Sequence, residues 1–230
     1  PPILLDEAPR DTWLEVPPLG ESAIREVLNL NRGRLRWDQG DPSAIPLPDE
    51  AAPEFLRLTN GHPLHLRYSL EELINRQHLP VSETIRDLPS CPDGGIGSYY
   101  DSLYRGIPEP SRRLLALFAV TGFPWPEAAL VQVLDPAGSR RDEILGALRP
   151  IRHLFQDTPQ GLVPFHSSLT HYLKPDQSLS VHREDVLGCV ATWLNGSAPD
   201  PVRWANQWLV AADRGAPDEI IQGPSEDWLA

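Results

Sequence analysis

Two short motifs contain the residues of this chain that could contact a ligand. The first is Asn60-Gly61-His62-Pro63-Leu64, where glycine and proline interrupt two leucine-rich segments of helical spacing. Because proline is favoured at the first position of a helix, the pattern predicts one helix that ends at Gly61 and another that begins at Pro63. Such a corner can lay the proline ring flat against a ligand. The alternative is a plain helix-turn-helix corner, with His62 as a surface or packing residue.

The second motif surrounds His166, which stands between a predicted strand and a predicted helix. An imidazole at this junction could reach a phosphate oxygen, and the N-terminus of the following helix would favour an anion. The alternative is a histidine that caps the helix or bonds the backbone. Ser167 and Ser168 are most simply N-caps of that helix.

Several other chemistries have no motif in these 230 residues. There is no Gly-x-x-x-x-Gly-Lys-Ser/Thr loop, no acidic strand end for magnesium and no Gly-x-Ser-x-Gly. His166 and His171 do not share a helix face and have no third partner, which argues against a metal site. Cys91 and Cys189 lie far apart and are interpreted as reduced thiols. We therefore expect no catalysis from this segment alone.

The elements that would position these motifs are mainly helical. Apolar periodicity predicts helices over 22–30, 49–59, 63–77, 79–88, 98–104, 109–120, 125–134, 141–148, 167–173, 181–194 and 202–212. Two extended runs at 154–157 and 161–165 flank Thr158-Pro159-Gln160 and predict a β-hairpin. Helices followed by a two-stranded wing describe a winged helix. A short strand is also expected at 13–16.

Glycine and proline punctuation divides the chain into segments. The predicted division is a helical domain over 1–90, a winged-helix domain over 98–176 and a helical segment over 177–230 that leads into a helical array, with a linker (PSCPDGGIG) at 89–97. Trp193, Trp204 and Trp208 follow helical spacing in the last segment. Such a stripe is more often core than a platform for a partner.

Composition excludes some classes of partner. The formal net charge of −12 argues against a broad nucleic-acid surface, which needs a basic face. The short basic pairs Arg112-Arg113 and Arg140-Arg141 do not change this, because the helix over 141–148 also carries Asp142 and Glu143. There is no run of 18 apolar residues and no signal peptide, so we expect a cytoplasmic protein. The absence of methionine suggests a segment of a longer protein.

The order of these motifs resembles that of the STAND switch ATPases, the NACHT and NB-ARC proteins. Gly61-His62-Pro63 is similar to the family's Gly-x-Pro motif in the helical domain after the nucleotide-binding core. Further similarity lies in Tyr99-Tyr100-Asp101-Ser102-Leu103-Tyr104, in Leu114-Leu115-Ala116-Leu117, and in a Phe-His-x-Ser-φ-x-x-Tyr-Leu ending at residues 165–173, where φ is apolar. The resemblance covers roughly residues 10–195.

The resemblance implies a nucleotide-dependent signalling switch. It places Pro63, with Gly61, against the adenine of ADP or ATP, and it places His166 on the β-phosphate of ADP. The phosphate-binding loop and Mg²⁺ would belong to a core before Pro1. ADP would hold the domains closed, and ATP would release the winged helix for self-association, with an unidentified effector or sensor partner. The alternatives from other classes are a non-enzymatic winged-helix transcription regulator and a helical protein-interaction scaffold.

Overall fold

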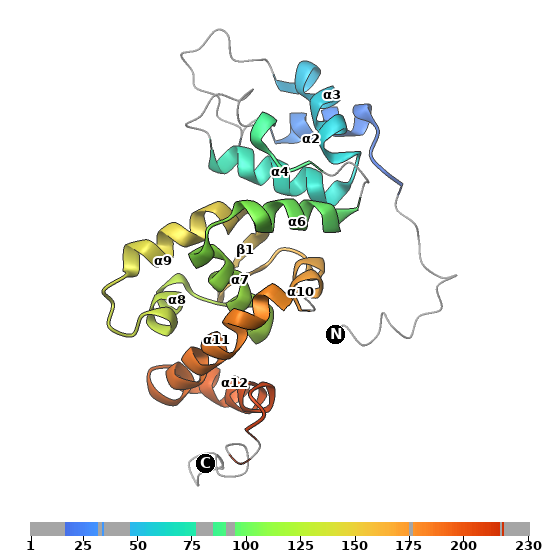
Figure 1. Ribbon diagram of the computed structural model, residues 1–230. Helices are drawn as coiled ribbons and strands as arrows, with labels where there is room; N and C mark the ends of the chain where they lie inside the picture. Colours follow the sequence, from blue (N-terminus) through green and yellow to red (C-terminus); the bar gives the residue numbers. More distant parts are fainter. Residues whose placement is uncertain are drawn as a thin grey trace. The chain divides into compact units, whose positions relative to one another are not determined.

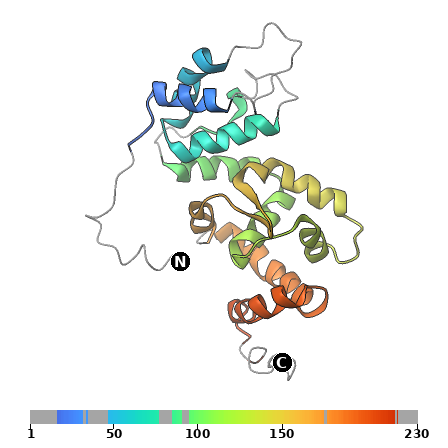
Figure 2. The same cartoon turned by 180° about the vertical axis from the view of Figure 1, so that it is seen from behind.

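The chain is mainly α-helical, with one small antiparallel sheet (Figures 1 and 2). The computed structural model describes residues 17–31, 34, 47–76, 85–90, 95–174, 177–216 and 218. The chain divides into two compact units, Pro1–Tyr99 and Tyr100–Ala230, which we call the N-terminal and C-terminal units. The strand expected at 13–16 lies outside the described residues, as does most of the loop that precedes α3.

The N-terminal unit is built on three amphipathic helices: α2 (Glu21–Leu30), α3 (Leu47–Thr59) and α4 (Pro63–Asn75). Helix α2 buries Ile24 and Leu28, which are four residues apart and therefore share a face. These side chains join one core with apolar residues of α3 and α4, among them Phe55, Leu66 and Leu70. The buried residues of α2 thus follow the helical spacing that was predicted from the sequence. Of the helix expected at 79–88, residues 85–88 are described: 85–87 are helical, and Leu88 forms a bend after them.

The C-terminal unit contains the helices and the β-hairpin that were expected to form a winged-helix domain. In order they are α6 (Ile96–Gly106), which begins before the division between the units, α7 (Glu109–Thr121), α8 (Glu127–Leu134), α9 (Arg141–Leu148), a 3₁₀ helix (Arg149–Leu154), β1 (Phe155–Thr158), β2 (Gly161–Pro164) and α10 (Ser167–Leu173). The β-hairpin predicted from the two extended runs is confirmed, with Thr158 opposite Gly161 and Phe155 opposite Pro164. Residues 96 and 97, expected in a linker, instead begin α6.

An isolated β-bridge lies beside the two-stranded sheet. Trp125 pairs with Leu162 of β2: the Trp125 N–H donates to the Leu162 carbonyl at 2.9 Å, and the Leu162 N–H donates back at 2.8 Å. The expectation that Trp125 begins a helix is therefore wrong, and α8 starts at Glu127, after Pro126. The proline supplies no backbone N–H, so the chain changes from strand pairing to helix at this residue.

Two further helices follow the wing, α11 (Gln177–Gly196) and α12 (Asp200–Asp213), which lie side by side (Figures 1 and 2). Trp193 of α11 is buried: its ring lies 5.2 Å from that of Trp125, and its indole N–H donates to Gln132 Oε1 at 3.2 Å. Trp204 and Trp208 of α12 are 43% and 49% exposed. The expectation of a single core stripe is therefore wrong for these two tryptophans.

Candidate functional site

The corner between α3 and α4 is made by two consecutive left-handed residues. Asn60 has φ 48° and Gly61 has φ 72°. The Thr59 side chain stabilises the turn from inside, because its hydroxyl donates to the Phe55 carbonyl at 2.7 Å and accepts from the Gly61 N–H at 3.2 Å. The His62 N–H donates to the Thr59 carbonyl at 2.9 Å, which closes the turn. The break predicted at this motif is therefore a tightly hydrogen-bonded corner.

The chain that enters α2 packs directly on Gly61. The Leu19 N–H donates to the Gly61 carbonyl at 2.8 Å. A Cβ at Gly61 would lie 2.5 Å from the Leu19 carbonyl oxygen, and 3.0 Å from the Pro18 Cβ. Glycine is therefore required here by space as well as by its positive φ. The segment Pro18-Leu19 and the Gly61 corner hold each other in place.

Pro63 is the first residue of α4, and its side chain is exposed. His62 precedes it as the N-cap, and its Nδ1 accepts the His65 N–H at 3.4 Å. A proline at this position already suits the helix start, so a plain helix-turn-helix corner accounts for the motif. The exposed ring, on a corner fixed from both flanks, is equally able to meet the flat face of a ligand.

His65 lies in the first turn of α4 and is completely buried. Its Nε2 is 2.8 Å from the Pro89 carbonyl oxygen, and its ring lies 4.5 Å from the ring of Tyr99. Burial lowers the pKa of His65 from 6.5 to about 4, because the apolar surroundings disfavour the charged imidazolium. At neutral pH the ring is uncharged, so Nε2–H donates to Pro89, and Nδ1 has no partner among the described residues. His65 is a packing residue.

His166 is the N-cap of α10 and is exposed. Its Nδ1 accepts the Ser168 N–H at 3.1 Å and is 2.8 Å from the Ser168 hydroxyl, which also bonds the Tyr100 hydroxyl at 2.9 Å. The expectation that Ser167 or Ser168 would be the N-cap is wrong, because these residues are the first two of the helix. The capping role weighed for His166 is the one it has here. Because Nδ1 is an acceptor, a neutral ring carries its proton on Nε2.

Gly61 and Pro63 belong to the N-terminal unit, and His166 belongs to the C-terminal unit. Within the described part of the chain, no group of three His, Cys, Asp or Glu side chains converges in a way that could hold a metal ion. None of the helices in that part is both long and apolar enough to cross a membrane.

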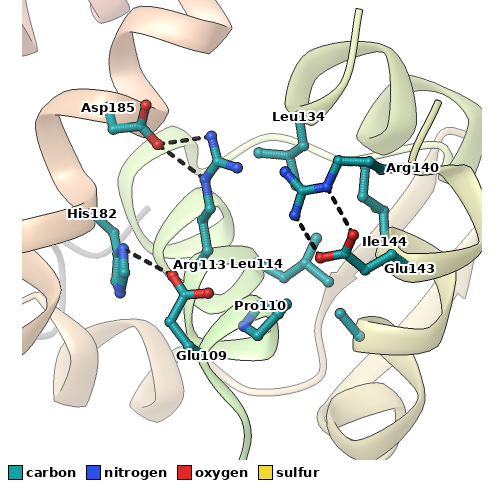
Figure 3. A pocket seen from close by; sticks show the side chains of 11 residues that line it. Glu109, Pro110, Arg113, Leu114, Leu134, Arg140, Glu143, Ile144, His182 and Asp185 are labelled. Carbon is teal, nitrogen blue, oxygen red and sulfur yellow. Dashed lines mark hydrogen bonds and ion pairs between the residues drawn. The ribbon is translucent and has the colours of Figure 1, made fainter. Parts of the chain in front are cut away.

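A second candidate site, which the sequence did not indicate, is a pocket of about 390 Å³ in the C-terminal unit (Figure 3). It is lined by α7, α9 and α11 and by the end of α8. The charged and titratable side chains around it are Glu109, Arg113, Arg140, Glu143, His182 and Asp185. The apolar ones are Pro110, Leu114, Leu134, Ile144 and Ala147. The basic pairs at 112–113 and 140–141 were its only sequence signal, since residues from separate helices have no common spacing.

Comparison of the chain with models of protein families, with curated proteins and with solved structures gives no match.

Proposed function

We propose that this chain is the switch module of a STAND-type, NACHT-like regulatory ATPase. In this function the module binds an adenine nucleotide that is shared with a phosphate-binding core outside this sequence. Pro63 packs on the adenine, and His166 contacts the β-phosphate of ADP. The core supplies the phosphate-binding loop and Mg²⁺, neither of which has a motif in these 230 residues.

The observation that supports this function best is the corner at Gly61. A corner that served only to join two helices could tolerate many residue types and loop lengths. Here the positive φ of Gly61, its close approach to Leu19 and the exposed Pro63 occur together. The result is a proline ring on a rigid support, which loses little conformational entropy when a base stacks on it.

The geometry of His166 fits a phosphate contact. Its Nδ1 is used in the cap of α10, so the exposed Nε2–H is left as a donor, and no partner for it lies among the described residues. An N–H donor that meets a phosphate oxygen forms a charge-assisted hydrogen bond. A contact made to bound ADP and changed on exchange for ATP would give the two nucleotides different affinities for the closed state. That difference is what a switch requires.

Native mass spectrometry tests this function. The sample is the full natural protein that contains this chain, and it is purified without added nucleotide. One molecule of ADP is expected in the wild-type protein. The variant Pro63→Ala should lose most of it, because alanine keeps the helix start but removes the ring. Retention of ADP by this variant would contradict the adenine contact.

A pair of substitutions separates the two roles of His166. Asparagine is a good N-cap residue, so His166→Asn should keep the cap of α10 while it removes the imidazole Nε2–H. We expect His166→Asn to lose ADP as completely as His166→Ala, with a melting temperature close to that of the wild type. His171→Asn, on the same helix, is the matched control and should keep its ADP. If His166→Asn also keeps its ADP, His166 is only a cap.

A further inference from the structure

The pocket in the C-terminal unit has two arginines on opposite walls, Arg113 from α7 and Arg140 from the residue before α9. Arg113 Nε donates to Asp185 at 2.9 Å, and its Nη2 lies 2.7 Å from the same carboxylate. Arg140 Nε donates to Glu143 at 2.8 Å, and its Nη2 donates to the other oxygen at 2.5 Å. Each arginine is thus oriented by an acidic neighbour from its own side of the pocket.

The remaining nitrogen of each guanidinium is directed inward. In Figure 3 the one nitrogen of Arg113 that carries no dashed line points toward Arg140, and the corresponding nitrogen of Arg140 points toward Arg113. These are the Nη1 groups, and neither has an acceptor among the described residues. Two N–H₂ donors of like charge that face each other across a space are complementary to one anionic group between them.

The acidic residues around the pocket do not occupy that space. Hydrogen bonding to Arg140 lowers the pKa of Glu143, so this carboxylate stays ionised beside its arginine. The Asp185 side chain is 56% exposed, whereas that of its partner Arg113 is 22% exposed. Glu109 is also exposed and lies 3.8 Å from His182. The carboxylates therefore lie mostly toward solvent.

The floor of the pocket is apolar. Leu114, Leu134 and Ile144 are buried residues that line it, together with Pro110 and Ala147. A volume of about 390 Å³ lies within the range of sites for small organic molecules. An anion without an apolar part would leave this floor facing water. A well-matched ligand therefore has an anionic group for the two arginines and an apolar part for the floor.

We propose that this pocket binds a small organic acid, whose single carboxylate bridges Arg113 and Arg140 and whose apolar body covers Leu114, Leu134 and Ile144. A singly charged acid suits the pocket better than phosphate, because three carboxylates stand around the rim and repel a dianion more strongly. The bound acid contacts α7, α8 and α9 together, and Arg113 links it to Asp185 of α11. This site is independent of the nucleotide contacts proposed above.

A ¹H–¹⁵N NMR titration of the 230-residue chain tests this site with three probes. The probe acid is 4-phenylbutyrate, its neutral analogue is 4-phenylbutyramide, and the third probe is inorganic phosphate. The acid is expected to shift amide signals of α7, of the end of α8 and of α9 in a saturable way. The amide should bind at least about tenfold more weakly, because it lacks the charge that both arginines recognise. Phosphate should not displace the acid.

Three variants locate the binding. Arg113→Gln and Arg140→Gln should each weaken binding of 4-phenylbutyrate by about tenfold or more. Arg141→Gln removes the same charge one residue away from Arg140, at an exposed position that does not line the pocket, so its binding should stay within about twofold of wild type. The Arg140–Glu143 pair is half exposed, so Arg140→Gln tests the site even if Arg113→Gln folds poorly.

Four results would overturn this assignment. They are the absence of saturation by the acid, equal binding of acid and amide, an equal loss in Arg141→Gln and Arg140→Gln, and displacement of the acid by phosphate. Equal losses would mean that the acid responds to overall charge rather than to a site. Displacement by phosphate would mean that the arginines hold an inorganic anion and that the apolar floor has no part in binding.

Discussion

At the scale of single residues, the candidate nucleotide contacts are also structural residues. Pro63 begins α4, and His166 caps α10, so each would be expected in a protein that binds no nucleotide. What distinguishes Pro63 is the rigid corner at Gly61 that precedes it. Gly61 is held against Leu19 by a hydrogen bond and by a distance that admits no side chain. The strictest requirement at this corner therefore falls on Gly61.

Gly61→Ala is predicted to destabilise the chain by about 2 kcal/mol or more. About 1 kcal/mol comes from the positive φ, and the rest comes from the overlap of the new methyl group with the backbone of Leu19. Urea unfolding measures the change. Gly97→Ala is the control, since Gly97 lies in α6 with open space around it, and its effect should be within about 0.5 kcal/mol. Equal effects of the two variants would contradict the packing described here.

His65 makes a prediction about pH. The unfolded imidazole titrates with a pKa near 6.5 and the folded one near 4, so the unfolded chain binds more protons between these values. Stability should therefore fall as the pH is lowered from 6.5 to 4, by up to about 3 kcal/mol from this residue. His65→Gln keeps a donor for Pro89 but does not titrate, so it should be less sensitive to acid over this range. Parallel curves of stability against pH for the two proteins would show that folding does not lower the pKa of His65.

At the scale of elements, the sequence predicted most of the helices and the β-hairpin of the C-terminal unit. The helix over Arg141–Leu148 and the helix over Ser167–Leu173 begin and end where they were expected, because apolar spacing and the residues at their ends agree. Trp125 was misassigned because its environment is not local. Its strand pairing is made with Leu162, which is distant in sequence, and Pro126 beside it also suits a helix start.

Gly161→Ala tests the packing of the Trp125 bridge against β2. Gly161 has φ 130°, which is accessible to glycine almost alone, and a Cβ there would overlap the backbone of Trp125 and Pro126. Gly122 also has a positive φ, 67°, but it is the C-cap of α7 with open space around it. We expect Gly122→Ala to cost about 1 kcal/mol and Gly161→Ala to cost about 3 kcal/mol. Equal costs in urea unfolding would mean that Trp125 does not pack against β2 as described.

At the scale of the whole molecule, apolar periodicity predicted a mainly helical chain, and the structure agrees. The pocket could not be predicted, because its arginines come from α7 and from the residue before α9, and α11 completes it. Sequence spacing relates residues within one helix but not between helices. For the same reason the exposure of Trp204 and Trp208 could not be read from their spacing, which shows that they share a face and not whether another element covers it.

The charge of the whole chain leads to the last prediction, which concerns DNA. In a DNA-binding winged helix, α9 would enter the major groove. Here its first turn presents Asp142 and Glu143, Arg140 is held by Glu143, and the net charge is −12. We expect no saturable binding of duplex DNA in fluorescence anisotropy, even at a salt concentration of about 50 mM, where phosphate contacts are strongest. Tight binding that weakens steeply with salt and is lost in Arg141→Gln would instead show that α9 contacts DNA, and would favour a transcription regulator over the nucleotide switch.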